Sequence, residues 1–132
     1  MQAAHELRTY LVTQSDVTDE VGTRIYPEVL PQSPTLPAVV FRTLTGNSHG
    51  HLSGKSCLAD SVVQFDCYAL TSLAARDAEE EIRKAVDRYE GGNIRGVFAQ
   101  APRSGYEKAT DGKDAGYYKA SRDYLVFYTE TV

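Results

Sequence analysis

The chain has 132 residues, of which 42% are hydrophobic and 24% are charged, and its formal net charge is −4. This length fits one domain, residues 1–132, and the composition excludes a wholly disordered protein. No apolar run of about eighteen residues occurs, so a membrane span is excluded. The lack of a lysine- or arginine-rich cluster argues against a protein that grips nucleic acid across a broad face.

The N-terminal quarter begins with helical spacing. Apolar residues recur every three or four positions over residues 3–14, which predicts a short amphipathic helix, and a second short turn over 17–21 ends at Gly22. No signal peptide is expected, because the N-terminus lacks a basic head followed by an apolar run. Residues 24–37 contain four prolines and are predicted to be extended chain, neither helix nor central strand.

Two strands separated by a long loop follow the proline-rich segment. Residues 38–45 are rich in β-branched and aromatic side chains, and residues 61–70 alternate between apolar and polar side chains. The stretch 46–57 between them holds three glycines and three serines and is predicted to be a loop. The simplest arrangement is a β-hairpin with an extended tip.

The clearest element of the sequence is a helix over residues 72–89. Its apolar stripe consists of Ala74, Ala78, Ile82, Val86 and Tyr89. Charged residues cover the rest, and the three consecutive glutamates at 79–81 are expected on the solvated face. Residues 94–100 and 117–129 are predicted strands, joined by a polar loop over 103–116.

These elements together predict an α+β fold. Two hairpins would form an antiparallel sheet of about four strands, with the long helix and the short N-terminal helix packed on one face.

The letters Gly-Lys-Ser at positions 54–56 invite comparison with a nucleotide-binding phosphate loop. That motif requires a glycine five positions before the second glycine, where this chain has His49. It also requires a helix directly after the loop, whereas a strand is predicted here. We therefore expect no nucleotide binding.

Two histidines and two cysteines of the central region could be taken for zinc ligands, but their spacing is wrong for a structural zinc site. His49 and His51 are followed by Cys57 and Cys67, which lie ten residues apart, and Cys67 falls on the apolar face of its strand. A solvated loop and a buried thiol are expected instead. No third group marks a cysteine nucleophile. We predict no metal, no cofactor and no catalytic residue, and hence a protein that is not an enzyme.

The two polar loops are long for so small a domain, and long loops are usually functional or disordered. The first carries His49, His51 and Lys55, and the second carries Arg103, Lys108 and Lys113. Two interpretations stay open: the loops order against a partner chain, or they are merely mobile tips.

Residues 15–46 contain, in order, a V-G-x-R-I-Y-P run, a P-Q pair and a P-A-hydrophobic-hydrophobic strand. The matching residues are Val21, Gly22, Arg24, Ile25, Tyr26, Pro27, Pro31, Gln32, Pro37, Ala38, Val39 and Val40. The strand VVQFDCYAL follows, and the chain ends on a similar pattern at Gly116, Tyr117, Tyr118, Ser121, Asp123 and Tyr124. This order resembles a phage and prophage family of tail-completion, or head–tail joining, proteins, and the resemblance covers nearly the whole chain.

The resemblance implies a virion structural protein similar to the lambda-type tail terminator of long non-contractile tails. It implies a ring, typically a hexamer, that caps the head-proximal end of the tail and contacts the tail tube and the head connector. DNA would pass through the ring without sequence-specific binding, and the protein would be made in the bacterial host cytoplasm.

Three groups of assembly contacts are predicted. They are the two loops, the connector around Arg24, Tyr26 and Pro27, and exposed edge-strand residues such as Tyr118 and Tyr124. The alternatives are a head-completion adaptor, a minor tail protein or, more distantly, a small ligand-binding α+β domain or enzyme.

Overall fold

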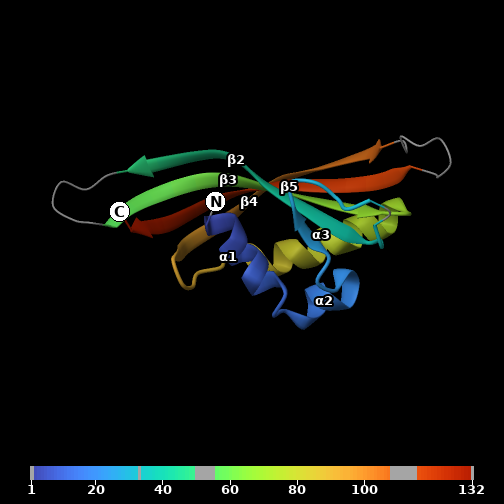
Figure 1. Ribbon diagram of the computed structural model, residues 1–132, viewed down its shortest axis with the longest axis horizontal. Coiled ribbons are helices and arrows are strands. Elements are labelled where there is room, and N and C mark those ends of the chain that lie inside the picture. The colour runs from blue at the N-terminus through green and yellow to red at the C-terminus, as the bar shows by residue number, and fades with distance from the viewer. Residues whose placement is uncertain (1, 33, 50–55, 108–115, 132) are drawn as a thin grey trace.

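A computed structural model describes residues 2–32, 34–49, 56–107 and 116–131. Its elements are α1 (Gln2–Leu11), α2 (Ser15–Val21), β1 (Ile25–Pro27), β2 (Ala38–His49), β3 (Ser56–Ala69), α3 (Ser72–Val86), β4 (Ile94–Glu107) and β5 (Tyr117–Thr131). One long sheet forms a layer, and all three helices lie on the same side of it (Figure 1). No described helix has both the length and the apolar character needed to cross a membrane.

The sheet is mixed and has five strands in the order β1-β2-β3-β5-β4. The predicted α+β class is confirmed, but the prediction of four antiparallel strands missed β1, which pairs in parallel with residues 39–41 of β2. Proline is tolerated in β1 because the strand lies at the sheet edge, where one side needs no donor.

The long strands run further than their sequences suggested. Residues 46–49 and 56–60 were predicted to be loop or connecting residues, but 46–49 pair with 58–61 in the β2–β3 ladder, and 56–60 also pair with β5. Residues 103–107, also predicted to be loop, pair with β5. Their glycines and polar residues have weak strand propensity, so the cross-strand partners decide their conformation. The remaining parts of both predicted loops lie outside the described residues.

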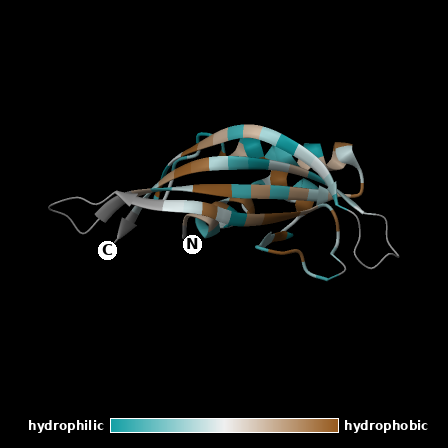
Figure 2. Cartoon of the chain, turned by 90° about the horizontal axis from the view of Figure 1, so that it is seen from above, coloured by the Kyte–Doolittle hydropathy of each residue, from teal (hydrophilic) through white to brown (hydrophobic). Residues whose placement is uncertain are grey.

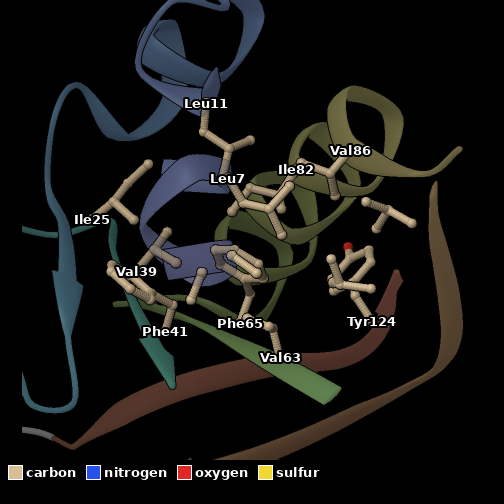
Figure 3. Packing of buried hydrophobic residues seen from close by; sticks show 14 of the residues in the cluster. Leu7, Leu11, Ile25, Val39, Phe41, Val63, Phe65, Ile82, Val86 and Tyr124 are labelled. Atoms are coloured by element: carbon tan, nitrogen blue, oxygen red, sulfur yellow. The ribbon is translucent and has the colours of Figure 1, made fainter. Parts of the chain in front are cut away.

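The core lies between the sheet and the helices, as Figure 3 shows. Phe65 of β3 is central: its ring centroid lies 6.0 Å from that of Phe41 and 5.6 Å from that of Tyr124. Leu7 of α1 and Ile82 of α3 close the core from the helical side (Figure 3). Alternation along the strands places these apolar side chains on one face.

Helix α3 begins at a side-chain cap, since Thr71 Oγ1 accepts a hydrogen bond from Ala74 N at 3.1 Å. The predicted apolar stripe is confirmed at its centre. Ala78, Ile82 and Val86 of the stripe are buried, whereas Ala74 and Tyr89 are half-buried. Ala75 and Glu79 of α3 are buried as well. The helix ends at Val86 rather than at residue 89, and Arg88 adopts a positive φ of 64° after it.

Gly22 ends α2, as predicted, and has a φ of 60°. A Cβ atom at this position would lie 3.0 Å from Arg24 Nη1, so a larger residue would be both strained and crowded. The turn directs the chain into β1 and the proline-rich connector.

Candidate assembly surfaces

No helix or strand of the described residues covers the face of the sheet opposite the helices, and Figure 2 looks onto this open face. Val63 and Phe65 point into the core, so the neighbouring residues Gln64 and Asp66 belong to the open face. The strand register extends this assignment to the other strands. Ion pairs between adjacent strands lie on the open face: Arg42–Asp66 at 3.7 Å, Arg103–Asp123 at 2.9 Å and Lys119–Glu107 at 3.3 Å.

Asp66 is the buried centre of this polar region, with only 2% of its surface exposed. Tyr68, two residues further along β3, is also buried. Its burial and, to a smaller extent, the nearby carboxylate of Glu107 raise the pKa of Tyr68 to about 12. The alternation over residues 61–70 is confirmed, but Asp66 and Tyr68 are buried although they lie on the face opposite the core.

The open face changes from polar to apolar along the strands. Val62, Leu125 and Phe98 are direct neighbours across three strands. Phe98 is 41% exposed and its ring lies 5.9 Å from that of Phe127 in an edge-to-face arrangement. These four residues are called the apolar strip. An exposed aromatic cluster on a sheet is typical of a surface that meets another protein.

The β4–β5 hairpin extends beyond the domain body, and two of its tyrosines there are exposed. Tyr106 and Tyr118 pair across the two strands with ring centroids 4.9 Å apart, and they are 53% and 39% exposed. The hydroxyl of Tyr106 accepts a hydrogen bond from Gly116 N at 2.9 Å. A Cβ atom on Gly116 would lie 2.1 Å from Glu107 O, so only glycine fits this close approach.

An ion pair between Glu79 of α3 and Arg122 of β5 lies on the covered face. Their side chains are only 7% and 12% exposed. Arg122 also donates from Nη1 to Gln100 O at 2.9 Å, so it joins the helix to two strands. The expectation that Glu79 lies on the solvated face is wrong: the residue points at the sheet and is neutralised there by Arg122.

The connector is fixed to the domain by arginine side chains. Arg24 Nε donates to Pro37 O at 2.9 Å, and Arg8 Nε donates to Ile25 O at 2.9 Å. Arg24 is therefore a residue that holds the connector in place. Tyr26 is half-buried, whereas Pro27, Glu28 and Val29 are exposed, and Val29 is 73% exposed.

The predicted contact residues fall into three groups. Arg103 and Tyr118 are exposed in the β4–β5 hairpin. Tyr124 is 0% exposed and packs on Phe65, so its predicted exposure is wrong, and both tyrosines lie on the interior strand β5 rather than on an edge. His49 is the last residue of β2, and His51, Lys55, Lys108 and Lys113 lie outside the described residues.

The exposure of several apolar residues was not predicted from the sequence, namely that of Val29, Leu44, Leu73, Phe98 and Tyr106. Strand alternation could have revealed Phe98, because its two neighbours lie on the core side. Val97 is buried, and Ala99 is paired with Tyr124 of the core. An apolar residue at the outward position of an alternating strand indicates a second contact surface.

A groove of about 820 Å³ lies beside α1 and is one place where a small ligand could bind if the protein were a ligand-binding domain. Tyr10 and Tyr89 stack on each other along its wall with ring centroids 3.9 Å apart. Glu6 accepts a hydrogen bond from Asn93 Nδ2 at 2.8 Å. The carboxylate is thus already engaged within the fold.

The buried thiol predicted at Cys67 is confirmed. Burial raises the pKa of Cys67 well above its ordinary value, and the carboxylates of Glu79 and Asp66 raise it further. The neutral thiol is a poor nucleophile. Among the described residues, no group of three or more His, Cys, Asp or Glu side chains is arranged to hold a metal ion.

Comparison with known proteins identifies relatives of this chain. A family model described as tail completion protein gp17 matches residues 5–129. A chain in the solved structure titled "Virion of native gene transfer agent (GTA) particle" has a similar fold, with a TM-score of 0.66 at 13% sequence identity. The similarity covers 94% of this chain and 92% of that one. No curated protein matches.

Proposed function

Because the chain belongs to the tail completion protein gp17 family, we propose that this virion structural protein caps the head-proximal end of the phage tail tube as a ring and joins the tail to the head. The family match over residues 5–129 is the observation that carries this proposal. The similar fold of a chain in the gene transfer agent virion is consistent with it.

A ring that ends tail growth needs two different faces. One face must bind the last ring of the tail tube, and the other must not bind another copy of the tube protein, so that polymerisation stops. The domain offers distinct surfaces for these contacts: the apolar strip, the exposed tyrosines of the β4–β5 hairpin, and the connector at Pro27 and Val29. We propose a hexameric ring through which DNA passes without sequence-specific binding.

The proposal also gives roles to the predicted contact residues. Arg24 positions the connector through Pro37, and Tyr26 and Pro27 present it to a neighbour. Arg103 and Tyr118 belong to the contact surface of the β4–β5 hairpin. We propose that His49, His51, Lys55, Lys108 and Lys113 contact the tail tube or the head connector when the particle assembles.

The experiment that tests this role is a stop codon early in the gene of the phage that carries it, followed by negative-stain electron microscopy of the lysate. Filled heads beside detached tails, especially tails of uncontrolled length, are the expected result. A plasmid copy of the intact gene should restore joined particles. Leaking heads beside free tails of normal length would move the role to head completion, and normal virions would overturn the proposal.

A further inference from the structure

The edge of the sheet at β2 is closed along one part of its length and open along the rest. β1 occupies it at residues 39–41, and Glu28 N donates to Phe41 O at 3.0 Å just beyond. Past the bulge between Thr43 and Thr45, no strand of the described chain pairs with the outer side of residues 45–49. Their outward backbone groups form an open edge.

The opposite edge, at β4, has the same two parts. Where β4 lies against the domain body, the turn after α3 closes it: Arg88 N donates to Val97 O at 2.7 Å, and Ala99 N donates to Asp87 Oδ1 at 3.0 Å. Pro102 follows a bulge and ends this protected part. Beyond it, residues 103–107 pair with β5 on one side, no strand of the described residues pairs with their other side, and all of them are exposed.

These two open stretches complement each other in position and direction. They lie on opposite edges of the sheet and towards opposite ends of β3. Residues 45–49 pair with residues 58–62 of β3, whereas 103–107 lie from the level of Asp66 towards the other end of β3. Strands β2 and β4 run antiparallel to each other. A second copy of the chain, displaced along the strands, can therefore place its β4 stretch beside the β2 stretch of the first copy in antiparallel pairing.

The charges allow this pairing. The stretch 45–49 has no acidic residue, lysine or arginine, whereas Arg103 and Glu107 bring one charge of each sign. Pairing therefore sets no like charges opposite each other. Because the contact is head-to-tail, a dimer still has one open stretch at each end, and only closure of a ring pairs all of them.

We propose that adjacent copies of this chain join by antiparallel β-pairing of residues 45–49 of one subunit with residues 103–107 of the next. This inference rests on the proposed ring and names the surface that closes it. The pairing continues the sheet from subunit to subunit and removes the open edges that would otherwise template aggregation.

Cysteine cross-linking in assembled particles tests the pairing. Cys57 is changed to serine, and the buried Cys67 is kept. One cysteine is placed in turn at each position of 45–49 and a second at each position of 103–107, including Gly105, where a Cβ atom meets nothing within 4 Å. Directly opposed residues of a non-hydrogen-bonded pair have Cβ atoms about 4.5 Å apart, at the upper end of the range that a disulfide spans. The matched control pairs Thr45→Cys with Asp123→Cys on the interior strand β5.

The expected result is a ladder of cross-linked oligomers in denaturing gels for pairs whose two residue numbers have one constant sum, which is the signature of antiparallel pairing. The control and the single-cysteine variants should give no ladder. Cross-linked pairs with a constant difference would overturn the inference, because they indicate parallel strands. An absence of all ladders would also overturn it. Electron microscopy of the same particles shows separately whether rings form, so the ring can stand while this contact falls.

Discussion

The two faces of the sheet alternate along the same strands, yet they are built from different interactions. On the covered face, Phe65 and Tyr124 are 1% and 0% exposed and pack beneath the helices. On the open face, Phe98 is 41% exposed, and cross-strand ion pairs such as Arg103–Asp123 link neighbouring strands. The covered face stabilises the monomer, whereas the open face costs little to change and is available for contacts. This contrast predicts different responses to matched substitutions.

The largest effect is expected for Phe65→Ala on the covered face. Removing this ring leaves a cavity between Phe41 and Tyr124, and such truncations cost about 3–5 kcal/mol in the free energy of unfolding. Urea denaturation followed by circular dichroism measures the loss. Phe98→Ala is the matched control on the open face and should lower stability far less. Equal losses would contradict the contrast between the faces.

The second effect separates two consecutive glutamates. Glu79→Ala leaves the mostly buried guanidinium of Arg122 without its carboxylate, and we expect a loss of about 2–3 kcal/mol, because 12% of the arginine side chain still reaches solvent. Glu80→Ala removes only an exposed i,i+3 pair with Arg83 and should change stability little. The same urea titrations compare the two variants. A larger loss for Glu80→Ala would refute the assigned role of Glu79.

The glutamate pair also shows how far sequence alone could go. Helical periodicity identified α3 and most of its buried stripe, and strand alternation identified the core face of β3, since both depend on local patterns. Glu79 looked identical to its neighbours because its burial depends on Arg122, which lies 43 residues away in sequence. A local pattern contains no information about such a partner.

The same limit explains the errors on the candidate surfaces. The proline-rich segment concealed β1, because three residues gain strand pairing only from β2. Tyr124 was predicted to be exposed on an edge strand, but β5 is an interior strand because it pairs with β3 as well as with β4. The order of strands in a sheet is a long-range property. It decides which residues face a partner, and local propensity does not reveal it.

The third prediction concerns alkaline pH and involves both faces. Burial raises the pKa of Tyr68 from 10.0 to about 12 and that of Tyr124 still further. The contribution of these two tyrosines to folding stability should therefore be constant below pH 9 and fall above it, since the unfolded chain releases protons that the folded chain retains. At pH 10.5 each tyrosine contributes a loss on the order of 1 kcal/mol.

Phenylalanine substitutions isolate these contributions. Tyr68→Phe and Tyr124→Phe should each reduce the difference in unfolding free energy between pH 8 and pH 10.5. Within the described part of the chain the Tyr124 hydroxyl has no hydrogen-bond partner, so Tyr124→Phe should also leave stability at pH 8 unchanged or slightly higher. An unchanged pH difference in both variants would show that neither hydroxyl is protected from ionisation.

The smallest effect is expected for Arg103→Ala on the open face. The Arg103 side chain is 50% exposed and its partner Asp123 is 23% exposed, so water and salt screen the pair. Pairs of this kind contribute about 0.2–1 kcal/mol, and the loss should shrink further as salt is raised. The variant should nevertheless weaken assembly, because Arg103 lies on the proposed contact surface, and complementation of the stop-codon phage would measure that defect. A monomer as stable as the parent with fewer joined particles is the expected combination. Full complementation would instead make Arg103 dispensable for assembly and limit its role to a weak cross-strand pair.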